Sequence, residues 1–167
     1  MQRIYKEIYL GSENDFYMNK DSFEYVMHAC KEPFHRNLLG YTGKSAPKDH
    51  PEYLVAYRDR ELYLNLVDAR TQNYIPINII EKAIRYLQIH EDNKVLVHCN
   101  LGESRSPSIV FLFLYLKTPY FTGKSFKEAL KSFKDLYSPF NPSQGMLEVL
   151  QQYDSTYPAA SLRSKRE

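Results

Sequence analysis

A short stretch in the middle of the chain combines a thiol, a glycine turn and an arginine. It reads His98-Cys99-Asn100-Leu101-Gly102-Glu103-Ser104-Arg105-Ser106-Pro107. Successive backbone N–H groups in a tight loop that leads into a helix can surround an anion such as phosphate. Gly102 allows the loop to turn tightly, and Arg105 offers a planar fork that matches two phosphoryl oxygens. The stretch therefore indicates a loop that binds a phosphoryl group beside a nucleophile.

Cys99 is the candidate nucleophile of this loop. The loop N–H groups, the helix dipole and Arg105 should all favour its thiolate, which is the form that attacks. Ser106 could donate a hydrogen bond toward the sulfur, and His98 could fix the end of the strand. The alternatives are a buried structural thiol for Cys99 and a surface position at a helix start for Arg105. An arginine at the positive end of a helix dipole is better explained by a bound anion.

Two predicted strands and the helix between them bring a carboxylate to the same place. Leu62–Val67 is apolar on both faces, as buried parallel strands are, and a helix with one apolar stripe begins at Pro76. Lys94–His98 is the second strand. Because such a parallel unit has a right-handed crossover, both strands end at one edge of the sheet, where ligands bind. Asp68 follows the first strand and Cys99 follows the second.

Asp68 is therefore the candidate general acid. Its alternative is a carboxylate that caps a turn, a common place for Asp. Asp59 and Asp92 are rivals, but each precedes one of the two strands and should lie at the opposite end of the sheet. Geometry decides first which group can donate a proton, so we favour Asp68.

The remaining patterns complete an α/β fold. Ile8–Leu10 and Tyr25–Cys30 are predicted strands, whereas residues 31–60 hold repeated Pro and Gly and are expected to form a long surface loop with at most one short helix. Three further helices are expected: one from about Arg105 to Lys117, one opened by the capping box Ser125–Glu128, and one opened by Asn141-Pro142. We expect a single domain over residues 1–157, with a mostly parallel central sheet of about four to five strands flanked by helices, and a polar tail over residues 158–167.

Composition and charge exclude several other classes of protein. The chain has 167 residues, 43% of them hydrophobic, and a net charge of +2, too balanced to indicate nucleic-acid binding. Two cysteines make no disulfide framework, and the N-terminus lacks the apolar run of a signal peptide. The longest apolar run, Ile109–Leu116, has 8 residues, whereas a membrane span needs about 20. We expect a soluble, cytoplasmic protein, monomeric by default, that contacts neither nucleic acid nor membrane.

The loop resembles the signature of a known superfamily. His98-Cys99, five residues, then Arg105-Ser106 is similar to the signature loop of the protein-tyrosine-phosphatase superfamily. It resembles most the small atypical dual-specificity phosphatases, whose loops commonly read HCxxGxSRS. The likeness runs from the strand at Tyr25 through the last helix. It includes Asp68, 31 residues before Cys99, and the segment Asn141-Pro142-x-x-Gly145 before the last helix.

This resemblance implies a role for each residue. Cys99 would attack phosphorus and form a phosphocysteine, and Asp68 would protonate the leaving oxygen and later activate water. Ser106 would assist breakdown of the intermediate, with His98 and Asn141 in support. The backbone amides that would hold the phosphoryl oxygens, beside the Arg105 side chain, belong to Asn100, Leu101, Gly102, Glu103, Ser104 and Arg105. No metal or organic cofactor is implied, and the spacing of His28, His35, His50 and His90 fits no metal site.

The implied substrate is a phosphorylated protein, most of all phosphotyrosine, with phosphoserine and phosphothreonine as further candidates. Glu103 inside the loop should discourage heavily anionic substrates, unless it simply points into solvent. Phosphoinositide phosphatases of the superfamily tend to carry basic residues there. RNA 5′-phosphate, phosphoinositide and phosphosugar substrates stay open, as does a non-catalytic phosphoprotein-binding role. We expect the 31–60 loop to form part of the cleft wall.

Cys30 is a candidate redox partner of Cys99. Some superfamily members carry a cysteine after a comparable strand, where it captures the oxidised nucleophile as a disulfide. A reactive thiol beside a resolving cysteine is the expected arrangement of a redox sensor. The alternative, a small buried hydrophobe, is slightly favoured.

Overall fold

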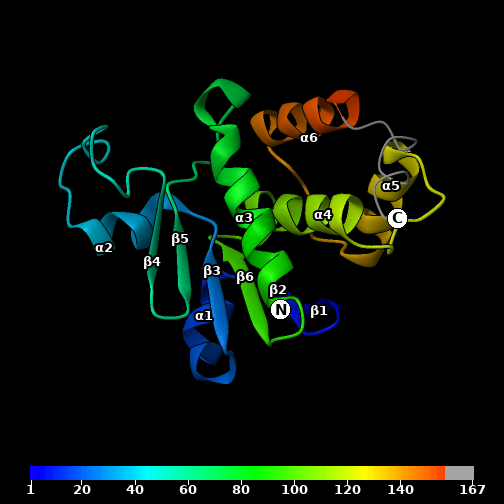
Figure 1. Ribbon diagram of the computed structural model, residues 1–167, viewed down its shortest axis with the longest axis horizontal. Helices are drawn as coiled ribbons and strands as arrows, with labels where there is room; N and C mark the ends of the chain where they lie inside the picture. Colours follow the sequence, from blue (N-terminus) through cyan, green and yellow to red (C-terminus); the bar gives the residue numbers. More distant parts are fainter. Residues whose placement is uncertain (157–167) are drawn as a thin grey trace.

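A six-stranded sheet forms the centre of the molecule (Figure 1). The computed structural model describes residues 1–156. The strands are β1 (Gln2–Tyr5), β2 (Ile8–Ser12), β3 (Tyr25–His28), β4 (Val55–Arg58), β5 (Glu61–Leu64) and β6 (Val95–Cys99). Their spatial order is β1-β2-β6-β3-β5-β4.

The inner strands run parallel and the outer strands do not. β6 pairs in parallel with β2 and β3, and β3 also pairs in parallel with β5. Every residue of β6 is buried, as expected for a parallel strand covered on both faces. β1 and β4 each pair antiparallel with their neighbour at the two edges. The chain therefore leaves β5 and β6 at the same end of the sheet.

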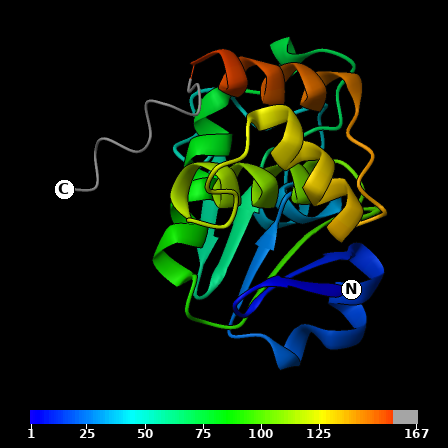
Figure 2. The same ribbon diagram turned by 90° about the vertical axis from the view of Figure 1, so that its right-hand side faces the viewer.

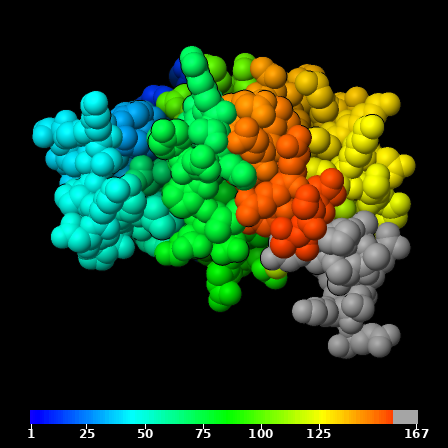
Figure 3. All heavy atoms as spheres, turned by 90° about the horizontal axis from the view of Figure 1, so that it is seen from above, coloured from blue at the N-terminus to red at the C-terminus, as the bar shows by residue number. Residues whose placement is uncertain are grey.

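Helices flank this sheet. They are α1 (Glu13–Asn19), α2 (Arg36–Leu39), α3 (Ile77–His90), α4 (Arg105–Lys117), α5 (Phe126–Leu136) and α6 (Gln144–Thr156), with short turns η1 (Lys20–Ser22), η2 (Lys31–His35) and η3 (Gln72–Tyr74). α4 packs against β6, β2 and three other helices, and its first eleven residues are all buried. Figure 2 shows α5 and α6 on the same side of the molecule as α4. In Figure 3 the orange surface of α6 lies between green α3 and yellow α5.

α1 and η2 cover the sheet around two buried histidines. Phe16 of α1 stacks on His98 with ring centroids 5.0 Å apart, and Phe34 of η2 stacks on His28 at 4.4 Å. α1 begins directly after β2 because Ser12 and Asp15 form a capping box. These aromatic rings seal the carboxyl ends of β3 and β6 from water.

The structure confirms the α/β class, the mostly parallel sheet and the helix over Arg105–Lys117, but the expected strand count is wrong. Six strands are present, because β1 and β4 add antiparallel edges. The 31–60 segment is also not a plain loop, since it contains η2, α2 and β4. β4 forms a hairpin with β5 through Asp59, whose φ of +50° suits a tight turn. Nearby Pro and Gly residues obscured this short strand in the sequence.

Other boundaries shift by a few residues. β5 ends at Leu64 rather than at Val67, and α6 begins at Gln144, after the Asn141-Pro142 pair. Within residues 1–156, no helix combines the length and apolar character needed to cross a membrane. The expected polar tail, 158–167, lies outside the described residues.

Candidate active site

The signature loop connects the end of β6 to the start of α4. Cys99 is the last residue of β6 and Arg105 is the first residue of α4. Gly102 at the turn has a φ of +74°, and a Cβ atom there would lie 2.7 Å from the carbonyl oxygen of Gly11. The loop therefore needs glycine both for its backbone conformation and for its close approach to β2. This confirms the predicted order of strand, tight loop and helix.

Cys99 and Arg105 are both buried in this loop. Cys99 is 2% exposed, and the Ser106 hydroxyl donates to its sulfur at 3.2 Å. Arg105 is 8% exposed, and its two Nη atoms donate to the Leu66 carbonyl at 3.2 Å and to Asn100 Oδ1 at 2.7 Å. Arg105 Nε is buried and has no hydrogen-bond partner among the described residues. A buried guanidinium donor that no described residue satisfies is suited to bind an anion.

Asp68 reaches this loop from the segment after β5. Its Oδ1 accepts a hydrogen bond from the Ser104 hydroxyl at 2.9 Å. The same hydroxyl oxygen accepts the backbone N–H of Ser143 at 2.9 Å. Asp68 itself is exposed, so its carboxyl group can meet a substrate that enters from solvent.

The segment before α6 fixes the far side of the loop. The Asn141 backbone N–H donates to the Glu103 carbonyl at 2.7 Å, and the Tyr137 hydroxyl donates to the Gly102 carbonyl at 2.8 Å. A Cβ atom on Gly145 would lie 2.5 Å from the Ala69 carbonyl oxygen, so glycine is required there. Asn141 thus supports the loop through its backbone. The sequence predicts no role for Tyr137 at the site, although a buried tyrosine hydroxyl usually finds a hydrogen-bond partner.

These segments enclose a cleft of about 330 Å³. Its lining residues are Asp68, Cys99, Asn100, Leu101, Glu103, Ser104, Arg105, Asn141, Pro142 and Ser143. None of them comes from 31–60, so the expectation that this segment forms the cleft wall is wrong. The segment does contact the signature loop, because the Glu32 carbonyl accepts a hydrogen bond from Asn100 Nδ2 at 2.9 Å. The rivals Asp59 and Asp92 do not line the cleft, and Asp92 pairs instead with Lys6 at 2.8 Å.

His98 lies beneath the loop in a buried chain of polar groups. Its Nε2 lies 2.7 Å from Nδ1 of His28, whose Nε2 lies 3.2 Å from Oε2 of Glu61. Tyr63 donates its hydroxyl to the same Glu61 oxygen. Burial lowers the pKa of His98 to about 3, and burial also lowers the pKa of His28 although Glu61 opposes this. Both imidazoles are therefore neutral near pH 7. The positions of His28 and Glu61 in the sequence did not indicate this series of hydrogen-bonded side chains.

Cys30 is a fully buried free thiol that follows β3. Burial raises its thiol pKa well above the usual range, and the positive charge of Arg105 opposes that rise. The next residue, Lys31, donates its backbone N–H to the Leu66 carbonyl at 2.9 Å. The Leu66 carbonyl also accepts a hydrogen bond from Arg105, so Cys30 lies close to the signature loop. Its redox role stays a prediction.

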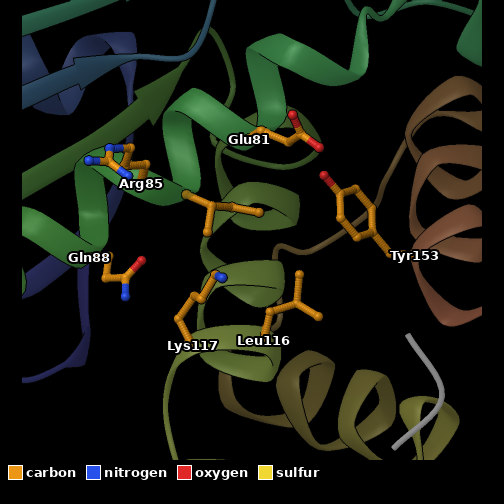
Figure 4. A pocket seen from close by; sticks show the side chains of 7 residues that line it. Glu81, Arg85, Gln88, Leu116, Lys117 and Tyr153 are labelled. Atoms are coloured by element: carbon orange, nitrogen blue, oxygen red, sulfur yellow. The ribbon is translucent and has the colours of Figure 1, made fainter. Parts of the chain in front are cut away.

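A second pocket, of about 290 Å³, lies away from this chemistry (Figure 4). Its walls come from α3, α4 and α6, and Figure 4 shows Arg85 and Gln88 of α3 on one side and Tyr153 of α6 on the other. None of the cleft residues lines it. Across residues 1–156, no three His, Cys, Asp or Glu side chains form a group that could hold a metal ion.

Curated proteins similar to this chain include phosphatases. The chain is 43% identical over 77 residues to rat dual specificity protein phosphatase 5, a match that covers 45% of this chain and 19% of that protein. It is 29% identical over 98 residues to mouse serine/threonine/tyrosine-interacting protein, covering 59% of this chain and 42% of that protein. The matched stretches thus span less than half the length of these relatives. No family model matches the chain.

Solved structures of similar fold superpose on most of this chain. Human DUSP28 superposes with a TM-score of 0.62 at 16% identity, covering 92% of each chain. DUSP15 gives a TM-score of 0.60 at 18% identity, over 92% of this chain and 86% of the other. PTPMT1 gives 0.59 at 20% identity, over 92% and 93%. At these identities the likeness establishes a common fold.

Proposed function

We propose that this chain, a small dual-specificity-phosphatase-like member of the protein-tyrosine-phosphatase superfamily, is an active enzyme. It hydrolyses phosphomonoesters through a phosphocysteine intermediate. The observation that carries the proposal is the buried Nε of Arg105, which has no hydrogen-bond partner within residues 1–156 and lies in the loop that holds Cys99. A structural arginine would have its buried donors satisfied. An anion-binding arginine keeps one for its ligand.

The first step forms the intermediate. The Cys99 thiolate attacks phosphorus, so that a sulfur–phosphorus bond forms while the bond from phosphorus to the ester oxygen breaks. Asp68 gives its proton to that leaving oxygen, and the alcohol departs neutral. Arg105 and the loop N–H groups stabilise the charge on the phosphoryl oxygens during transfer.

The second step regenerates the enzyme. Asp68, now a carboxylate, accepts a proton from water while the water oxygen attacks phosphorus. The sulfur–phosphorus bond breaks, inorganic phosphate leaves, and the electron pair returns to Cys99 as a thiolate. The hydroxyl of Ser106, which donates to the sulfur at 3.2 Å, stabilises that departing thiolate.

The substrate is a phosphorylated protein, with phosphotyrosine as the first candidate. Arg105 is the only cationic side chain among the described residues that line the cleft, and two carboxylates, those of Asp68 and Glu103, line the same cleft. This balance suits one phosphoryl group on an otherwise lightly charged surface. Phosphoinositides and RNA 5′-phosphates bring additional negative charge, which these carboxylates would repel. A phosphosugar remains an alternative for the same chemistry.

A second candidate function is phosphoprotein binding without turnover. The similarity to mouse serine/threonine/tyrosine-interacting protein favours it, since the human protein of that name is described as tyrosine phosphatase-like. The presence of both Cys99 and Asp68 argues for catalysis, because binding alone requires neither.

Hydrolysis of a fluorogenic aryl phosphate between pH 5 and 8 tests the proposal. The wild type and Cys99→Ser are compared in the presence of reductant and a metal chelator. Turnover by the wild type and none by the variant is the expected result. A folded wild type without turnover would overturn the catalytic proposal and direct the work to phosphopeptide binding.

A further inference from the structure

The side chain of Asn100 connects α1, η2 and the start of α4. Its Oδ1 accepts from Arg105 Nη2 at 2.7 Å. Its Nδ2 donates to Glu13 Oε2 at 2.7 Å and to the Glu32 carbonyl at 2.9 Å. We propose that Asn100 is a positioning residue that holds the Arg105 guanidinium in the orientation that receives a phosphoryl group. The catalytic importance of this role rests on the proposed function, but the binding experiment that tests the role does not require turnover.

The chemistry of the partners fixes the orientation of the amide. Arg105 can only donate, so it must face Oδ1, whereas the Glu13 carboxylate and the Glu32 carbonyl can only accept, so they must face Nδ2. A short side chain with one acceptor and two donors is required. Asparagine alone provides this at such a length, and an aspartate would place an acceptor against two acceptors.

The two anchors of the amide are themselves held in place. Ser12 pairs with Cys99 in the parallel register of β2 and β6, so Glu13 lies beside Asn100, and the Glu13 N–H donates to the Asn100 carbonyl at 3.1 Å. On the other side, the Glu32 carboxylate accepts from Nε and Nη2 of Arg36 at 2.6 and 2.7 Å. The amide is thus fixed from both α1 and η2.

These contacts restrict the guanidinium at two points. One Nη atom of Arg105 is held by Asn100 and the other by the Leu66 carbonyl. The buried Nε–H remains without a partner among the described residues, and each Nη keeps one further hydrogen. Two fixed points define the plane of the group before the ligand arrives. Without one of these two hydrogen bonds the Arg105 side chain could rotate. Ligand binding would then have to order the side chain, and the entropy lost in doing so would weaken the affinity.

Binding of tungstate, a tetrahedral oxyanion, tests the inference without turnover. Calorimetry is done in a Cys99→Ser background on four proteins: the background itself, Asn100→Ala, Arg105→Lys and the double variant. We expect Asn100→Ala to weaken binding about fivefold to tenfold and Arg105→Lys to weaken it more. If Asn100 acts through Arg105, adding Asn100→Ala to Arg105→Lys should cause little further loss.

Asn93→Ala serves as the matched control. Asn93 contacts Glu24 at 3.3 Å in the turn before β6, at the other end of the strand from the cleft. This variant should bind tungstate as the background does. Asn100→Asp should bind more weakly than Asn100→Ala, because its carboxylate opposes both anchors.

Two results would overturn the inference: tungstate affinity unchanged in Asn100→Ala, or losses in Asn100→Ala and Arg105→Lys that simply multiply in the double variant. Should Asn100→Ala fail to fold, Glu13→Ala removes one anchor from outside the loop. It should weaken binding about threefold, and this loss should also vanish in Arg105→Lys. The losses of tungstate affinity in Asn100→Ala and Arg105→Lys could fail to multiply in a protein that hydrolyses no phosphomonoester. That result would support the role of Asn100 and refute the proposed function.

Discussion

The hydroxyl oxygen of Ser104 lies 2.9 Å from Oδ1 of Asp68, and it also accepts the backbone N–H of Ser143 at 2.9 Å. One buried side chain of the signature loop therefore orients the proposed general acid and ties the segment before α6 to it. The acid is held against the loop before any substrate arrives.

Replacement of Ser104 by alanine should impair the acid step. Without the hydroxyl, Asp68 loses its orienting donor, so we expect about a tenfold fall in kcat for aryl phosphates with poor leaving groups. Phosphates with good leaving groups should be affected much less. The exposed Ser155→Ala is the control. Equal losses on both kinds of substrate would show that Ser104 only stabilises the loop.

Replacement of Asp68 by asparagine should have the same pattern with a larger amplitude. Asparagine keeps an acceptor for Ser104 but cannot donate a proton to the leaving oxygen. We expect a loss of about 10²-fold to 10³-fold on poor leaving groups, with a steeper dependence of kcat/KM on leaving-group pKa. Rates measured across a series of substituted phenyl phosphates provide the test. A uniform loss along the series would remove Asp68 from the acid role.

Oxidation should link Cys30 to Cys99 slowly at neutral pH. Burial raises the pKa of the Cys30 thiol, so its thiolate fraction is small near pH 7 and grows about tenfold per pH unit. After mild peroxide, non-reducing peptide mapping should show the cross-linked peptide forming faster at pH 9 than at pH 7. Cys30→Ser should show none. Absence of the peptide at both pH values in the wild type would leave Cys30 as a small buried hydrophobe.

Acid should destabilise the protein through its buried histidines. Burial lowers the folded-state pKa of His98 to about 3, while an unfolded imidazole titrates near about 6.5. Between these values the unfolded state binds more protons, so the free energy of unfolding falls as pH falls. His98 contributes at most about 1.4 kcal/mol per pH unit. Denaturant unfolding between pH 7 and 4 should show a shallower pH dependence in His98→Gln, and an unchanged slope would contradict this account.

The signature loop could be predicted because its signals are local or follow from topology. A short apolar strand, Gly102 and Arg105 before an apolar helix define strand, loop and helix, and the handedness of parallel connections brings Asp68 to the same edge. The fold class follows from the same unit. The same unit is sufficient to predict a mostly parallel sheet.

The missed features depend on contacts between distant parts of the chain. β4 exists because it pairs with β5, and its four residues carry little strand signal of their own. The contact of Tyr137 with the Gly102 carbonyl requires α5 to end beside the loop. The side-chain role of Asn100 likewise needs Glu13 and Glu32 in place. The spacing of residues along the sequence predicts none of these three contacts.

The contact between Gly102 and Gly11 restricts the residues that both positions can carry. A Cβ atom on Gly102 would overlap the Gly11 carbonyl, and one on Gly11 would come within 3.0 Å of the Asp15 side chain. Gly102 cannot gain a methyl group unless the end of β2 moves away, which would also displace Glu13 from Asn100, whereas a methyl group on Gly11 would push against the Asp15 side chain. The shape of the signature loop therefore depends on which residues stand in the N-terminal strand, far from the loop in the sequence. A substitution in that strand can disturb the loop without touching any residue of the signature.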